Sequence, residues 1–255
     1  MRAVERITHM KTLLAVLLTT ASCFGFQTNY TFTAERLWDF TGSYETPGDD
    51  DYTTVITHSP FGGVFGNFHE NQQDTNQSVI GSGSGVFTGK VSSGSQGVRM
   101  LTKWELHFNG HYTETGHTLH IDFKGKGVIT LNGTNLDGTL SGRACQTRNG
   151  STDCKHGAVG FPEVMLNADM TGAWQLSLDV TTTGKAIAGN ATVTLSNGRT
   201  LTFAVSGRKR TSKCSLRLTG NGDAAGAKLS VTTDPDFGMK KASGRLLGQT
   251  IKVLR

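Results

Sequence analysis

A cluster of histidine and carboxylate residues is one place where this sequence could carry chemistry. Its members are Glu105, His107, His111, His120 and Asp122. Imidazole and carboxylate groups bind Zn²⁺ or Cu²⁺, and a metal held there could support a hydrolytic or redox reaction. A three-residue turn at 108–110 would place His107 opposite His111, and the polar positions of the next strand would share that face. The spacing matches no zinc signature, so a solvated polar strand face is the alternative interpretation.

A second candidate site is a run of basic residues around a predicted hairpin turn. It comprises Arg208, Lys209, Arg210, Lys213 and Arg217. Convergent positive charge attracts anions such as acidic polysaccharide or lipid headgroups, and an envelope protein is a further expected partner. Nucleic acid is disfavoured because no aromatic residues interleave with these cations for base stacking. The alternative is that lysine and arginine solubilise a sheet face and protect its edges.

The charge distribution singles out the C-terminal part of the chain. The 255 residues have a formal net charge of +5. Residues 26–169 nevertheless contain nine lysines and arginines against fifteen aspartates and glutamates, whereas residues 170–255 contain thirteen against four. The modest total therefore conceals an acidic part followed by a strongly basic one, which favours anion binding by the basic part.

The first 25 residues have the features of a secretory signal peptide. Arg2, Arg6 and Lys11 precede an apolar stretch at residues 13–18, and small residues follow it. The apolar stretch is far shorter than the ~20 residues that a membrane-spanning helix needs. We therefore expect an exported protein, in the periplasm, on the cell surface or outside the cell.

Two processing routes are open for this leader. Signal peptidase could cut after Cys23 or Gly25, since small residues stand at the required positions before each bond. Alternatively, residues 20–23 resemble a bacterial lipobox, which would make Cys23 a lipidated N-terminus and provide the only expected membrane contact. Translation could start at Met1 or at Met10.

Export makes the cysteines interpretable, because disulfides persist in oxidising compartments. Cys145 and Cys154 enclose a polar loop with a turn signal, and we expect a disulfide between them. Cys214 is then left over as a buried thiol in a strand, or it pairs with an uncleaved Cys23 or with another chain. No Cys-x-x-Cys pair exists, so the cysteines suggest no metal site.

The elements that would position these residues are predicted to be short antiparallel strands. Most segments after residue 25 alternate polar with apolar residues and are interrupted by Asn-Gly, Asp-Gly or Thr-Gly. In the clearest hairpin, residues 191–205, a two-residue loop would send the apolar side chains of the two strands to opposite faces. A three-residue loop with Gly198 in the left-handed region pairs Leu195 with Arg199 and keeps one apolar face, so it is favoured.

The same alternation continues to the C-terminus and suggests no helix. Further strands are predicted at residues 175–180, 213–218, 227–232, 239–246 and 250–254. The fold class is therefore all-β, an antiparallel meander that forms a closed barrel or two packed sheets. After the signal peptide at 1–25, we expect an acidic, Gly/Ser/Asn-rich β region at 26–165 and a basic β-meander at 166–255, unless both form one continuous domain.

Part of the chain resembles known sequences. The segments 191–207, 215–220 and 244–253, with their Asn-Gly-Arg-Thr-Leu, Leu-Arg-Leu-Thr-Gly and Gly-Gln-Thr-Ile motifs, resemble the closing meander of uncharacterised exported bacterial proteins. The resemblance covers roughly the last third of the chain. It implies β architecture and a bacterial envelope setting, and its motifs are strands and turns that imply no activity.

The leading functional hypothesis is an exported, non-catalytic protein that binds an anionic or glycan ligand or an envelope partner. Residues 81–85 have glycine where a Gly-x-Ser-x-Gly elbow would need its nucleophile, so no hydrolase signature is present there. The alternatives are a metal-dependent enzyme that uses the histidine cluster and a structural envelope protein. Whether the protein is an enzyme stays open, and no cofactor is expected other than Zn²⁺ or Cu²⁺ in the first of these alternatives.

Overall fold

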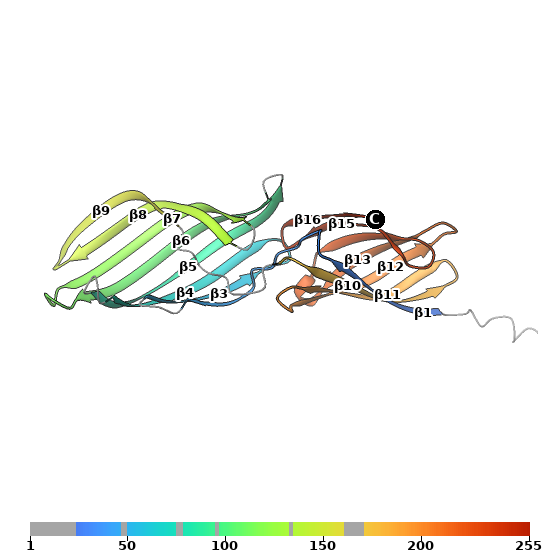
Figure 1. The fold of residues 1–255 in the computed structure, drawn as a ribbon, viewed down its shortest axis with the longest axis horizontal. Coiled ribbons are helices and arrows are strands. Elements are labelled where there is room, and N and C mark those ends of the chain that lie inside the picture. The colour runs from blue at the N-terminus through green and yellow to red at the C-terminus, as the bar shows by residue number, and fades with distance from the viewer. Residues whose placement is uncertain (1–23, 47–49, 75–78, 95–96, 133–134, 161–170) are drawn as a thin grey trace, which may run out of the picture.

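The computed structural model describes residues 24–46, 50–74, 79–94, 97–132, 135–160 and 171–255 (Figure 1). These residues form two eight-stranded antiparallel sheets, and the one helical element among them is a 3-10 turn, η1 (Gly222–Ala224). The expectation of an all-β antiparallel meander is therefore confirmed. In this part of the chain, no helix is long and apolar enough to cross a membrane.

Sheet A contains the N-terminal strand and all the strands after residue 171. Its order follows the chain: β1 (Phe24–Phe32), β10 (Trp174–Thr183), β11 (Ala186–Leu195), β12 (Thr200–Lys209), β13 (Cys214–Asn221), β14 (Lys228–Thr233), β15 (Met239–Leu246) and β16 (Gln249–Leu254). The register of β1 runs from Phe24 opposite Thr182 to Phe32 opposite Trp174. The chain thus begins sheet A, builds all of sheet B, and then returns, although the sequence predicts a single boundary near residue 165.

Strict alternation in sheet A produces one continuous core. Alternate residues of β10 to β14 face the core and most of them are buried, and this inner face carries large aliphatic and aromatic side chains such as Leu176, Phe203 and Leu218. The rings of Phe32 and Trp174 stack with their centroids 4.1 Å apart, which joins β1 to this core. Burial of such side chains contributes roughly 1.5–3 kcal/mol each, so this sheet is stabilised mainly by its inner face.

Side chains bring the two edges of sheet A together. The Tyr30 hydroxyl on β1 donates to the Phe237 carbonyl in the loop before β15, and the rings of Phe26 and Phe237 stack at 4.5 Å. Burial raises the pKa of Tyr30 to about 12, so this phenol stays protonated and can act as a donor. Beyond β16, Arg255 donates to the Thr31 carbonyl at 2.8 Å. Sheet A is therefore curled around its core.

The hairpin between β11 and β12 has the predicted three-residue loop. The Leu195 N–H donates to the Arg199 carbonyl at 2.9 Å, and Val193 lies opposite Leu201. Gly198 has φ of +82°, a left-handed conformation that glycine adopts without a steric penalty. Both predictions for this hairpin are confirmed.

Sheet B is a second meander made of longer strands. Its members are β2 (Gly42–Thr46), β3 (Asp50–His58), β4 (Gly63–Asp74), β5 (Val79–Gly94), β6 (Gly97–Tyr112), β7 (Thr118–Asn132), β8 (Asn135–Arg148) and β9 (Ser151–Gly160). The predicted turn at 108–110 is wrong, because β6 runs through it to Tyr112. Gly110 is extended there, and a Cβ at this position would lie 2.6 Å from the Phe108 ring, so glycine makes room for that buried side chain.

The inner face of sheet B alternates aromatic rings with glycine. The Phe87 ring lies against Gly66 and stacks on Trp104 with centroids 4.5 Å apart, and the Phe123 ring lies against Gly125. Because glycine contributes no side chain, the buried residues form two separate clusters. The larger, next to sheet A, contains Phe40, Ile56, Val64, Phe87, Val91, Val98, Met100, Ile129 and Leu131, and the smaller contains Val79, Phe108 and Leu119.

Candidate functional site

The outer face of sheet A carries a concentration of exposed cations, which we call the basic face. Alternation along β12 to β16 directs six basic side chains outward from these five strands. They are Arg208, Arg217, Lys228, Lys241, Arg245 and Lys252, and all six are exposed. None of them makes a hydrogen bond or an ion pair with another described residue, so their charges face solvent.

Strand register determines what surrounds these cations. Arg217 lies between Ser206 on β12 and Ser230 on β14, and Lys228 lies directly opposite Arg245 on β15. Directly opposed side chains are ~5 Å apart, and successive outward positions along a strand are ~7 Å apart. Strands β12 to β16 contain no aspartate or glutamate. The result is an uninterrupted positive surface with hydroxyl groups between the charges.

The structure separates the five residues that the sequence grouped together. Arg208 and Arg217 lie on the basic face. Lys209 belongs to the opposite side of β12, where its register partner is the buried Cys214. Arg210 and Lys213 lie in the turn after β12, joined by a 2.8 Å backbone hydrogen bond.

Four members of the basic face were missed, because they come from later strands. Lys228, Lys241, Arg245 and Lys252 are not close to Arg208 in the sequence, so no local run of charge marks them. The hairpin register would have identified these four residues, because it determines which residues of each later strand lie on the same face as Arg217.

The predicted histidine cluster does lie on one face, the outer face of β6 and β7. Asp122 is opposite His107, and His120 is opposite Asn109, while His111 lies near the end of β6. The His107 Nδ1–Asp122 Oδ1 distance is 2.6 Å, and Lys124 donates to Glu105 at 2.8 Å. Hydrogen bonding to Asp122 raises the pKa of His107, and the hydrogen bond from Lys124 lowers the pKa of Glu105.

These side chains form a chain of surface ion pairs along the strands. His107 and Asp122 are 52% and 65% exposed, so the pairs are well hydrated and each is worth little stability. Among the described residues, no group of three or more histidine, cysteine, aspartate or glutamate side chains is arranged to hold a metal ion.

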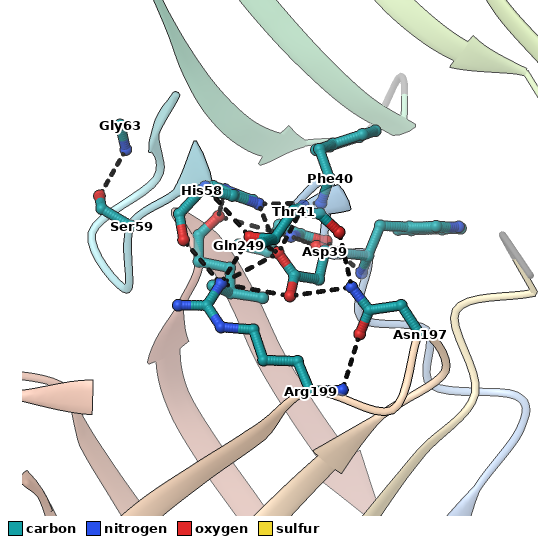
Figure 2. Close-up of polar contacts among 11 residues, drawn as sticks. Asp39, Phe40, Thr41, His58, Ser59, Gly63, Asn197, Arg199 and Gln249 are labelled. Atoms are coloured by element: carbon teal, nitrogen blue, oxygen red, sulfur yellow. Dashed lines mark hydrogen bonds and ion pairs between the residues drawn. The ribbon is translucent and has the colours of Figure 1, made fainter. Parts of the chain in front are cut away.

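A buried polar network joins the two sheets, and sequence analysis did not foresee it (Figure 2). Asp39, in the segment between β1 and β2, has both carboxylate oxygens 3.2 Å from Arg199 Nη1 of sheet A. Arg199 also donates to the His58 carbonyl at 2.7 Å, and Asn197 donates to Asp39 at 3.2 Å and to the Thr41 carbonyl at 3.1 Å. The 160 residues between Asp39 and Arg199 leave no local signal of this contact.

The surroundings of Asp39 keep it ionised. Burial of its carboxylate, whose side chain is 1% exposed, acts to raise its pKa. Hydrogen bonding to His58, Thr41 and Asn197 and attraction to Arg199 together outweigh burial and lower the pKa from 3.8 to about 2. The charged pair is therefore maintained at every physiological pH.

Two further buried side chains complete this junction. His58 Nε2 lies 3.1 Å from the Leu247 carbonyl, and the Phe40 N–H is 3.3 Å from His58 Nδ1. Gln249 makes a reciprocal pair with the Trp38 backbone, accepting from its N–H at 3.0 Å and donating to its carbonyl at 2.6 Å. His58 and Gln249 are both buried, so these contacts help to position the two sheets against each other.

The cysteine predictions are resolved for the described residues. Cys145 and Cys154 lie directly opposite each other on β8 and β9 and form the expected disulfide. The turn between them has Asn149 and Gly150 at φ of +49° and +80°. Cys214 is a free, buried thiol at the start of β13, whereas Cys23 lies outside the described residues.

Comparisons with protein-family models, curated proteins and solved structures found no match to this chain. The functional conclusion below therefore depends on the geometry and charge of the sites themselves.

Proposed function

We propose that this protein is an exported, non-catalytic binding protein whose basic face holds an acidic polysaccharide. The observation that carries the proposal is the set of six solvent-facing cations on β12 to β16, none of them neutralised by a described acidic neighbour. Concentrated charge of one sign attracts polyanions over a distance comparable to the Debye length.

The composition of the face favours a sugar polymer over other anions. Serine and threonine alternate with the cations, and their hydroxyls can exchange hydrogen bonds with sugar hydroxyls and acid groups. The outward positions of these strands include no aromatic residue, so they offer nothing on which nucleic-acid bases could stack. A row of regularly spaced charges instead suits an extended chain with repeating acid groups.

Charge reversal on this face provides the test. In the variant Arg217→Glu/Lys241→Glu, we expect binding to dextran sulfate and polygalacturonate to weaken about tenfold or more, because four units of charge are lost. The matched control, Lys126→Glu/Arg143→Glu, makes the same change of net charge on the outer face of sheet B. It should alter binding no more than about threefold.

Surface plasmon resonance with immobilised polymer measures both variants, with neutral dextran as a blank. Binding of the unmodified protein should fall steeply as salt is raised, because exposed charges are screened. If acidic polymers do not bind, or if both variants lose affinity equally, the proposal is wrong and a structural envelope role gains support.

Export is part of the same proposal. Strand β1 begins at Phe24, and Phe24 and Gly25 pair with Thr182 and Thr181 of β10. Cleavage after Gly25 would remove two paired residues of this strand, so we propose cleavage after Cys23 in preference to that site. Lipidation of Cys23 would also leave the strand whole, and the mass of the N-terminus distinguishes these two routes. The disulfide of sheet B is compatible with an oxidising compartment. The intact mass of the protein recovered from a bacterial periplasm should start at Phe24; an acylated or uncleaved N-terminus would contradict this.

A further inference from the structure

A cleft of about 610 Å³ opens where sheet A meets sheet B, away from the buried Asp39–Arg199 pair. Its volume is within the range of small-molecule sites, which is ~300–1,000 Å³. One wall comes from the β3–β4 turn, β5 and β6, and the other comes from the loop before β14, from β14 and from the β15–β16 hairpin. We call it the junction cleft.

Part of the sheet B wall of the junction cleft is apolar. Phe61 and Leu101 line it and are 65% and 58% exposed, which are high values for large apolar side chains. The Phe61 ring lies over Gly226 of sheet A, where a Cβ would come within 2.4 Å of the ring. Val91 and Ala227 lie behind these residues and are buried. The cleft thus presents apolar surface that folding leaves uncovered.

Three cations line the same cleft. Lys228 and Arg245 are direct cross-strand neighbours on the sheet A wall, and Lys90 faces them from sheet B, next to Leu101 in the ladder. Among the described residues, none that lines the cleft is acidic, and none of the three cations pairs with a described carboxylate. Their charge is therefore available to a ligand.

Backbone contacts hold the walls in place. The Leu247 N–H of sheet A donates to the Pro60 carbonyl of sheet B at 2.7 Å, and within sheet B the Val91 N–H donates to the Gly62 carbonyl at 2.6 Å. Gly62 and Gly248 pack so closely that a Cβ on Gly62 would lie 2.6 Å from the Gly248 Cα, and both have positive φ. A site fixed in this way needs little reorganisation when a ligand enters, which favours affinity.

We propose that the junction cleft binds a single-chain anionic amphiphile. Its carboxylate, sulfate or phosphate head contacts Lys228, Arg245 and Lys90, and its apolar body lies against Phe61 and Leu101. Charge complementarity selects the head, and the exposed apolar wall selects a ligand that needs to leave water. The inference goes beyond polysaccharide binding, because it depends on the apolar wall and holds whether or not the basic face binds a sugar polymer.

Isothermal titration calorimetry with decanoate, kept below its micelle concentration, tests the proposal on the intact protein. We expect one site per chain. Decanol and inorganic sulfate should each bind at least tenfold more weakly, since each lacks one half of the recognised chemistry. If decanol binds as tightly as decanoate, the cations do not contribute to binding. If sulfate binds as tightly as decanoate, the apolar wall does not contribute. Either result contradicts the proposal.

Substitutions locate the site and separate it from the basic face. Leu101→Asn and Phe61→Ser should each weaken decanoate about tenfold without changing dextran sulfate binding, and Arg245→Gln should weaken both. The control Val55→Ser removes an apolar side chain that is 50% exposed on β3 of sheet B, away from both the cleft lining and the basic face, and it should change neither. Because all of these side chains are exposed, the variants should keep the thermal midpoint of the parent.

Two results would overturn the proposal. One is decanoate binding that is insensitive to both apolar substitutions. The other is binding only to phosphatidylglycerol vesicles and not to free decanoate, which would identify a membrane surface as the source of the anionic head. If the unmodified protein binds decanoate but does not bind dextran sulfate, the polysaccharide function is refuted and the proposal for the junction cleft stands.

Discussion

Sheets A and B have the same topology but are stabilised differently. Each is an eight-stranded antiparallel meander, and Figure 1 shows them end to end. The inner face of sheet A forms one continuous cluster of buried residues, whereas that of sheet B is divided into two. Equal strand number and topology therefore do not imply an equal core.

The difference originates in the side chains of the inner faces. Sheet A places large apolar residues such as Leu176, Val193 and Phe203 at most inward positions of β10 to β13. Sheet B gives many of these positions to glycine, so that a ring such as Phe87 covers Gly66 instead of meeting another side chain. An aromatic ring that covers a glycine packs well against the neighbouring strand. Such a pair contributes few side-chain atoms, however, and so does not form one continuous core.

The outer faces of the two sheets differ in how their charged side chains are paired. On sheet B, Lys124, Glu105, His107 and Asp122 neutralise one another along the surface. On sheet A, the six cations of the basic face have no such partners among the described residues. The well-packed sheet is thus the one that groups six unpaired cations on one face, and its core supports a surface that remains available to ligands.

The largest expected effect comes from truncating the core of sheet A. Phe203 is 1% exposed, and Phe203→Ala should lower the free energy of unfolding by about 3–5 kcal/mol. The matched change Phe108→Ala in the small cluster of sheet B should cost about 2 kcal/mol, because few residues surround the space that it leaves. Denaturant titration measures both, in backgrounds that keep Trp174 alone to report on sheet A or Trp104 alone to report on sheet B. Equal losses would mean that the two cores are equivalent.

The second effect concerns the junction between the sheets. Arg199→Met leaves the buried carboxylate of Asp39 without its cation, and we expect a loss of about 3 kcal/mol. The two tryptophan signals should then report separate transitions, because this network couples the sheets. The double variant Asp39→Asn/Arg199→Met should recover part of the loss, and a single coincident transition in Arg199→Met would argue against coupling through this pair.

The third effect should be confined to sheet B. Cys145 and Cys154 are nine residues apart, and replacing both with serine removes a cross-link worth about 2.5 kcal/mol in the chain-entropy description. In the Arg199→Met background, where the junction no longer couples the sheets, the transition reported by Trp104 should move to lower denaturant, and that reported by Trp174 should stay unchanged. Mild reduction of Arg199→Met with both cysteines present should reproduce the result. Movement of the Trp174 signal instead would show that the sheets do not unfold independently.

The smallest effect is the response of the junction to acid. The pKa of Asp39 is lowered from 3.8 to about 2, so its contribution is fully present above pH 4 and is lost as the pH falls toward 2. The contribution amounts to about 2 kcal/mol. Asp39→Asn lacks this group, so the stability difference between parent and variant should shrink over that interval. A difference that stays constant down to pH 2 would contradict an ionised, stabilising Asp39.

Local features of the sequence predicted local features of the structure. The three-residue turn with Gly198 was predictable, because only that loop keeps the apolar residues of both strands on one face. The Cys145–Cys154 pair was predictable from its loop length and turn residues. The turn at 108–110 was wrong because an Asn-Gly pair also fits an extended strand when glycine must accommodate a neighbouring ring.

The candidate sites were predictable only in part. Arg208 and Arg217 were found because they lie close together in the sequence, whereas Lys228 and Arg245 required the register of two further hairpins. Lys209 was grouped with Arg208 because it follows it in the sequence, but adjacent residues of a strand point to opposite faces, and the structure separates the two.

The sequence by itself determined the strands, most of the turns tested, the disulfide and the division of charge, because each depends on residues that are near one another along the chain. Only the tertiary structure decided that β1 joins β10, that Asp39 meets Arg199, and that Lys90 faces Lys228 across a cleft. These contacts join residues more than a hundred positions apart. They form when the two sheets pack against each other. The alternation of polar and apolar residues depends only on neighbours along the chain, so it does not predict these contacts.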